Sequence, residues 1–255
     1  MIPQLAALAR RHRRIEFMLA LLVAAAFSNG IGVARADQLT LAPNLVDFES
    51  SQGSGIFLEA SSREAYWPLA AEFVTQKNQA FCGVASLVMV LNSLALPAPT
   101  TADYAPYTIF TQDNVFNDKT DKIVTADTVA HGGMTVDQLG GLVGSFGLSA
   151  TVTHASDSTE AQFRSAASDY LAQKGHFVLV NYLRSTLGQQ SGGHISPLAA
   201  YDAKTDRFLI LDVARYKYPP VWVTTKDLFA AMNTVDQSND NRTRGYVLIS
   251  GPPRP

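Results

Sequence analysis

The one cysteine of this 255-residue chain, Cys82, stands at the start of a long apolar segment. Residues 84–94 are mostly apolar helix formers, and Pro97 ends the run. Because Gly83 follows the thiol directly, we expect Cys82 to be the first residue of a helix that emerges from a loop. A thiol there feels the positive end of the helix dipole, which stabilises the reactive thiolate. A nucleophilic cysteine is one interpretation; a buried structural thiol is the other.

Gln76 adds a second feature near the same point, six residues before Cys82. Its side-chain amide can direct an N–H group toward the region of the Cys82 backbone N–H. A side-chain donor beside a backbone donor is what an oxyanion hole requires. The two residues together therefore predict stabilisation of a negatively charged oxygen beside the thiol.

A histidine and an aspartate meet in a β-hairpin predicted further along the chain. His194 precedes one strand-like apolar run, and Asp212 ends the next. A turn centred at Ala203 places the two residues directly opposite, and a turn centred at Lys204 places them on the diagonal of one face. In both registers the carboxylate reaches the imidazole and can fix its tautomer, as the third member of a triad with Cys82 does. A satisfied core histidine and an aspartate that merely ends a strand are the alternatives.

The remaining pattern predicts an α+β protein, with helices first and an antiparallel sheet afterwards. Helices are expected at 64–74, between Cys82 and Pro97, at 136–146, from Thr159 to Gly175, and at 226–232. Strands are expected at 149–154, 177–183, 195–201, 207–212 and 246–250. Residues 50–55 are expected to be a loop, and residues 99–124 a long loop with short helical turns. Three histidines without a comparable partner are interpreted as structural or surface residues: His131, His154 and His176.

The first 36 residues have the pattern of a signal peptide. A basic cluster at 10–14 precedes an apolar segment at 17–27 that is too short to span a bilayer, and Ala34-Arg35-Ala36 is an A-x-A cleavage site. We therefore expect cleavage after Ala36 and export, in a bacterium to the periplasm, with an uncleaved anchor as the alternative. Residues 37–63 are interpreted as an N-terminal arm and 64–255 as the catalytic domain.

Charge and cysteine content exclude several function classes. The 20 basic and 22 acidic side chains nearly balance, so the chain offers no electrostatic case for binding nucleic acid. One cysteine can form neither an internal disulfide nor a cysteine-rich metal cage. We therefore predict no metal site, and the oligomeric state, a homodimer included, stays open.

Three segments resemble the phytochelatin synthase family. The first, residues 76–86 (QKNQAFCGVAS), is similar to the nucleophile segment of that family. The second comprises 193–201 (GHISPLAAY) and continues through 208–223, and residues 242–246 (RTRGY) look like the family's Arg-Gly-aromatic segment. The resemblance extends from about Tyr66 to Ser250. It implies a papain-like fold, with the nucleophile helix packed on an antiparallel sheet that carries histidine and aspartate.

The resemblance also implies an activity on glutathione, γ-Glu-Cys-Gly. Cys82 would attack the Cys–Gly bond, His194 would be the general base and acid, Asp212 its orienter, and Gln76 the oxyanion donor. Glycine would leave, and water or a second glutathione would take the γ-Glu-Cys group from its thioester on Cys82. No cofactor is needed, and heavy-metal ions would enter only as glutathione thiolates.

Three further residues are implied at the acyl site. Arg244 would pair with a carboxylate of the γ-glutamyl end, since a guanidinium fork suits a carboxylate. Asn181 and Gly193 would line the same site. A surface salt bridge is the alternative interpretation of Arg244.

Two departures from the family affect the expected products. The sequence ends at Pro255, without the Cys-rich C-terminal region of plant members, and it has one cysteine where plant members have several near the nucleophile. We therefore expect mainly hydrolysis to γ-Glu-Cys and glycine, with some dipeptidyl transfer. The alternatives are a general or leader-trimming papain-like peptidase and, from another class, a periplasmic thiol or metal-binding module with Cys82 and His194 as ligands.

Overall fold

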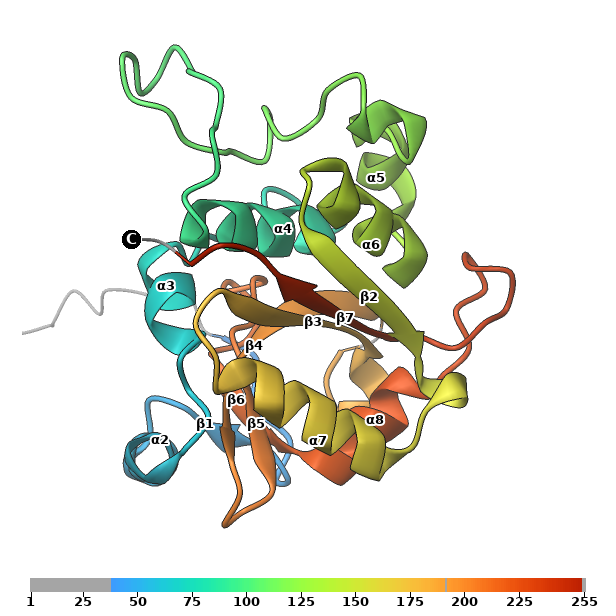
Figure 1. Cartoon of the computed structure of the whole chain (residues 1–255). Coiled ribbons are helices and arrows are strands. Elements are labelled where there is room, and N and C mark those ends of the chain that lie inside the picture. The colour runs from blue at the N-terminus through green and yellow to red at the C-terminus, as the bar shows by residue number, and fades with distance from the viewer. Residues whose placement is uncertain (1–37, 191, 254–255) are drawn as a thin grey trace, which may run out of the picture. The chain divides into compact units, whose positions relative to one another are not determined.

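An antiparallel sheet organises the part of the chain that the computed structural model describes, residues 38–190 and 192–253 (Figure 1). Within those residues seven strands pair in the order β1-β6-β5-β4-β3-β7-β2. The strands are β1 (Val46–Asp47), β2 (Ser149–His154), β3 (His176–Leu183), β4 (Gly193–Asp202), β5 (Arg207–Ile210), β6 (Val221–Thr224) and β7 (Gly245–Ser250). The strand predictions for 149–154, 177–183, 195–201 and 246–250 are confirmed within one or two residues.

Helices cover both faces of this sheet. Figure 1 shows α4 and α6 over one face and α7 and α8 over the other. The helices are α2 (Ser51–Glu59), α3 (Tyr66–Ala71), α4 (Cys82–Ser93), α5 (Ala126–Gly132), α6 (Val136–Ser145), α7 (Glu160–Leu171) and α8 (Thr225–Met232), with 3-10 turns η1 (Thr120–Lys122), η2 (Ala155–Asp157) and η3 (Arg184–Leu187). Helices packed on an antiparallel sheet confirm the predicted α+β class.

Every residue of α4 is buried, which accounts for its nearly uniform apolar sequence. The helix begins at Cys82, as predicted, and Phe81 is its N-cap residue. It packs against β4, the strand that carries His194. The packing of α4 on β4 therefore brings the thiol and the imidazole to one side of the sheet.

The prediction of a loop at 50–55 is wrong, because α2 begins at Ser51. The Ser50 side chain accepts a hydrogen bond from Gly53 N and caps the helix. A Cβ at Gly53 would lie 2.0 Å from the Asp47 carbonyl oxygen, and Trp222 Nε1 donates to the Gly53 oxygen at 3.0 Å. The serines and glycines of this segment therefore serve capping and close packing rather than a loop.

Two further segments differ from the predictions, since strand β6 and helix α5 were not expected. The predicted loop with short helical turns at 99–124 contains η1, as expected. Strand β6 pairs with both β1 and β5, so residues of the N-terminal segment enter the sheet. The expected signal peptide, residues 1–36, lies outside the described residues. Over the residues that are described, no helix combines the length and apolar character that a membrane crossing requires.

Candidate active site

The Cys82 thiol lies at the start of α4 and lines a pocket of about 270 Å³. The side chain is only 6% exposed. Gly83 is required beside it, because a Cβ there would come within 2.6 Å of Met134 Sδ and 3.1 Å of Ile195 Cδ1. Those two apolar side chains line the pocket as well, so they pack around the start of the helix.

His194 and Asp212 are in contact, as the hairpin predicts. Next to the turn Asp202 pairs with Arg207, which centres the turn between Lys204 and Thr205, a register that was not predicted. A bulge between Leu198 and Ala200 then brings Leu198 opposite Ile210, the second of the two predicted registers, with histidine and aspartate on the diagonal. His194 Nε2 lies 2.9 Å from Asp212 Oδ1.

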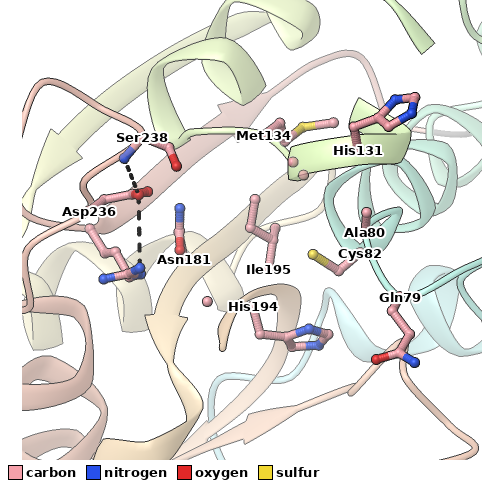
Figure 2. A pocket seen from close by; sticks show the side chains of 14 residues that line it. Gln79, Ala80, Cys82, His131, Met134, Asn181, His194, Ile195, Asp236 and Ser238 are labelled. Atoms are coloured by element: carbon pink, nitrogen blue, oxygen red, sulfur yellow. Dashed lines mark hydrogen bonds and ion pairs between the residues drawn. The ribbon is translucent and has the colours of Figure 1, made fainter. Parts of the chain in front are cut away.

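The contacts of the imidazole determine which nitrogen can serve the thiol. His194 Nε2 lies 2.9 Å from Ser196 Oγ in addition to Asp212 Oδ1. Nδ1 is then the ring nitrogen left to hydrogen-bond the Cys82 thiol. Figure 2 shows the Cys82 sulfur and the His194 ring on the same side of the pocket.

The electrostatics favour a thiolate–imidazolium pair. Burial by itself raises the pKa of the Cys82 thiol, but the hydrogen bond and charge of His194 bring that pKa below its ordinary value. Burial is the largest single influence on His194 and lowers its pKa, but the charge and hydrogen bond of Asp212 together with the hydrogen bond to Cys82 raise that pKa above its ordinary value. The pKa of Asp212 is itself held well below its usual range, against the effect of burial, chiefly by the His194 charge. These shifts favour the ion pair, in which Cys82 is present as the nucleophilic thiolate and His194 carries the proton that the leaving group needs.

The opposite end of the pocket carries a second set of polar groups. Figure 2 shows Asn181, Asp236 and Ser238 across from Cys82 and His194. Asp236 Oδ1 accepts the Ser238 backbone N–H at 3.1 Å. Asp236 was not predicted from the sequence. It belongs to a polar loop between α8 and β7, and this loop lies at the pocket because β7 pairs with β3 in the sheet.

Arg244 lies at this second end and is only 9% exposed, which excludes the interpretation of a surface salt bridge. Its Nη1 donates to Val235 O at 2.6 Å and Thr234 Oγ1 at 3.1 Å, and its Nη2 lies 3.8 Å from Asp236 Oδ1. Among the described residues its Nε has no hydrogen-bond partner. A Cβ at Gly193 would lie 3.3 Å from both Nε and Nη2. Gly193 therefore leaves one side of the guanidinium clear.

Gln76 is buried but does not line this pocket. Its Nε2 donates to Asn78 O at 2.7 Å and to Tyr216 Oη at 3.1 Å. Its Oε1 is buried without a hydrogen-bond partner among the described residues. Both amide protons are thus engaged within the protein, so the predicted oxyanion role requires an exchange of partners.

The other histidines differ in their settings. His131 is exposed and lines the pocket on the Cys82 side, so this surface residue borders the candidate site. His154 is buried and has a partner that the sequence did not indicate, since its Nε2 lies 3.1 Å from Asp137 Oδ2. His176 makes a local hydrogen bond, in which Nδ1–H donates to Lys174 O at 3.0 Å. Across the described residues no group of three or more His, Cys, Asp or Glu side chains could hold a metal ion.

Comparison with known proteins places these features in a family. A family model described as phytochelatin synthase matches residues 36–246. The chain is 38% identical to glutathione gamma-glutamylcysteinyltransferase 1 of Lotus japonicus, over 85% of this chain and 42% of the relative. The corresponding values are 37%, 84% and 47% for glutathione gamma-glutamylcysteinyltransferase 2 of Arabidopsis thaliana, and 31%, 79% and 48% for the enzyme of Schizosaccharomyces pombe. The chain spans less than half the length of these relatives. It belongs to the phytochelatin synthase family.

Proposed function

We propose that this chain is a thiol enzyme with a papain-like fold that cleaves the Cys–Gly bond of glutathione. The observation that carries the proposal is one pocket with a thiol–imidazole pair at one end and a buried arginine and aspartate at the other. The names of the relatives, glutathione gamma-glutamylcysteinyltransferases, support the same substrate. A nucleophile at the start of α4, packed on an antiparallel sheet that carries His194 and Asp212, supports the papain-like fold.

The second end of the pocket suits the glutamyl residue of glutathione. The γ-linkage leaves both the α-carboxylate and the α-ammonium group of that residue free. The Arg244 guanidinium binds the carboxylate, and its unpartnered Nε is available for this bond. Asp236 takes the ammonium group, while Asn181 and Gly193 line the site. An α-linked peptide lacks this free zwitterion, so the pocket selects the γ-linkage.

In the acylation step the Cys82 thiolate attacks the carbonyl carbon of the substrate cysteine. The Cys82 backbone N–H and the Gln76 amide stabilise the oxyanion. To do so, Gln76 gives up its hydrogen bond to the hydroxyl of Tyr216, a residue that is about half exposed, and donates to the oxyanion instead. The His194 imidazolium gives its proton to the glycine nitrogen, the C–N bond breaks, and glycine leaves. The γ-Glu-Cys group remains as a thioester on Cys82.

In the deacylation step the now neutral His194 accepts a proton from the incoming nucleophile. Water gives γ-Glu-Cys, and the α-amino group of a second glutathione gives (γ-Glu-Cys)₂-Gly. Either nucleophile attacks the thioester carbon, the C–S bond breaks, and Cys82 leaves as the thiolate beside the newly protonated His194, so the pair is as it began. One triad therefore performs both hydrolysis and transfer.

We expect hydrolysis to predominate over transfer. Gln79 and His131 border the Cys82 side of the pocket and are exposed, so water reaches the thioester freely. A second glutathione competes only if the protein holds it beside the thioester. Chromatography of the products at millimolar glutathione, with and without cadmium, measures the balance. We expect mainly γ-Glu-Cys and glycine, with little of the longer peptide.

Two outcomes would contradict this account in different ways. A predominance of (γ-Glu-Cys)₂-Gly that grows with cadmium would show that the chain holds an acceptor, taken as a metal thiolate, better than we expect. Cleavage of ordinary α-linked peptides without cleavage of glutathione would replace the proposed function with that of a general peptidase.

A further inference from the structure

Arg184 contacts the triad from within the protein, at the start of η3. The side chain is buried, and its guanidinium contacts both oxygens of Asp212. Nη2 donates a hydrogen bond to Oδ1 at 2.8 Å, whereas Nη1 lies 2.8 Å from Oδ2 as an ion-pair contact, and Oδ2 has no hydrogen-bond partner among the described residues. It does not line the pocket. A permanent cation therefore shares the Asp212 carboxylate with His194.

The Asp212 carboxylate is fixed by several donors at once. Its Oδ1 lies 2.9 Å from His194 Nε2, and it accepts hydrogen bonds from Arg184 Nη2 at 2.8 Å and from Ala214 N at 2.9 Å. Strand β5 ends at Ile210, but the backbone stays held on both sides of Asp212 by the hydrogen bonds of Leu211 N and Val213 N. The orientation of the side chain then depends on its three donors, of which Arg184 alone among the described residues contacts both carboxylate oxygens.

Arg184 is itself held in place by its surroundings. Its Nη1 donates to Gln189 Oε1 at 2.6 Å, and its guanidinium carbon lies 5.2 Å from the centre of the Tyr218 ring. Its backbone N–H donates to Gly192 O at 3.0 Å, two residues before His194. The arginine therefore links Asp212 to the segment that leads into the histidine.

The triad and Arg184 together hold two negative charges, on Cys82 and Asp212, and two positive charges, on His194 and Arg184. Cys82 faces the His194 ring from α4, and the centre of the edge-on Tyr182 ring on β3 lies 5.6 Å from its centre. On the other side of the ring, Nε2 contacts Asp212, which in turn contacts Arg184. The pocket wall adds three more titratable or charged groups at greater reach: His131, Asp236 and Arg244. Of the causes that shift the pKa of His194, burial and the Arg184 charge lower it, and Asp212 raises it.

We propose that Arg184 is a positioning residue for the reaction proposed above, acting through Asp212. It holds the carboxylate in the orientation that aligns the His194 ring, and it neutralises part of the carboxylate charge. An imidazolium beside a lone carboxylate would be stabilised too strongly to release its proton to the glycine nitrogen. The reaction in this inference rests on the proposed function, whereas the effect on His194 can be measured without any substrate.

A purely structural ion pair makes a different prediction. Buried ion pairs are weak evidence for a contribution to stability, and loss of one partner destabilises because the other charge is left unpaired. A structural Arg184 would therefore lower the melting temperature when replaced and leave the titration of His194 unchanged. Titration separates the two roles.

The test compares Arg184→Met, Arg184→Lys and a matched control, Arg164→Met. Arg164 pairs with Asp206 through two contacts of 2.8 and 2.9 Å and lies outside the pocket. The readouts are the titration of the His194 ring by proton–carbon NMR, assigned by its loss in His194→Gln, and kcat and KM for glutathione.

Removal of the guanidinium in Arg184→Met should let the Asp212 charge act fully on the ring. His194 should then titrate about one pH unit higher, and the alkaline limb of kcat/KM should follow. We expect kcat to fall on the order of 10²-fold because the ring is misaligned, with KM little changed because Arg184 does not touch the pocket. Arg164→Met should leave the His194 titration unchanged.

Arg184→Lys keeps the positive charge but loses the planar guanidinium that contacts both carboxylate oxygens. This variant therefore tests the positioning role if Arg184→Met does not fold. We expect the His194 titration to stay near that of the natural protein and kcat to fall roughly 10-fold. An unshifted or lowered His194 titration in folded Arg184→Met, or full kcat in Arg184→Lys, would overturn the proposal. If the natural protein does not cleave glutathione, the proposed function fails alone, and the titration still decides the effect of Arg184 on His194.

Discussion

Replacement of Cys82 by serine abolishes the release of glycine from glutathione in our account, and His194→Ala does the same. The two residues act as a unit, so loss of either removes nearly all of the rate, roughly 10⁴-fold or more. The serine hydroxyl is a far weaker acid than the thiol, and at neutral pH His194 cannot hold it as the charged nucleophile. Glycine release, followed with an amine-reactive reagent, measures the effect.

The control for the histidine is His176→Ala. His176 packs edge-on against Tyr170 at 5.0 Å and lies outside the pocket, so its loss should leave turnover unchanged. Glycine release by Cys82→Ser at a near-normal rate would show that the mechanism is wrong. The same rate in a folded His194→Ala would remove the imidazole from it.

Asp212 requires a gentler substitution than alanine. Asp212→Ala leaves the buried Arg184 charge without its carboxylate, a change that typically costs about 3–5 kcal/mol of stability. Asp212→Asn keeps an acceptor for the guanidinium and removes only the charge. Residual turnover in Asp212→Asn should exceed that of Cys82→Ser, because the nucleophile and its base are both still present.

Arg244→Ala is expected to have the second largest effect, and the effect depends on the substrate. If the guanidinium binds the free α-carboxylate of the glutamyl residue, its loss costs about 2 kcal/mol or more, which is roughly 30-fold or more in kcat/KM for glutathione. The dipeptide Cys-Gly has no glutamyl group, so its slow cleavage should be the same with and without Arg244. Steady-state rates for both substrates measure the difference.

Arg242→Ala is the matched control for Arg244. Arg242 stands two residues earlier, is about half exposed and pairs with Asp137 and Asp157 at the surface. Its loss should leave kcat/KM for glutathione within about 2-fold, since surface pairs contribute little. Equal turnover of glutathione and Cys-Gly by the natural protein would contradict recognition of the γ-glutamyl end.

The sequence predicted the parts of the site that depend on local pattern. The start of α4 follows from a glycine after the thiol and an unbroken apolar run. The contact of His194 with Asp212 follows from two strand-like runs around one polar turn, although the bulge that sets the final register was not predicted. Both predictions depend only on residues that lie near one another in the sequence.

The missed features depend on contacts between distant segments. Arg184 and Asp212 are 28 residues apart and meet only after β4 pairs with both β3 and β5. Asp236 reaches the pocket through the loop before β7, which no local periodicity marks. Helix α2 was missed because its serines and glycines have the composition of a loop, while their capping and packing partners, Trp222 among them, lie far away in sequence.

The central claim is that Cys82 carries the γ-Glu-Cys group as a thioester. Its most direct test is the mass of the intact protein, measured after rapid mixing with glutathione and an acid quench. We predict an added mass of one γ-Glu-Cys group, located on Cys82, released by hydroxylamine and absent from Cys82→Ser. Contradiction would come from the mass of a whole glutathione released by a reducing agent, which indicates a mixed disulfide. Glycine release at the full rate with no adduct at any quench time would contradict the claim equally.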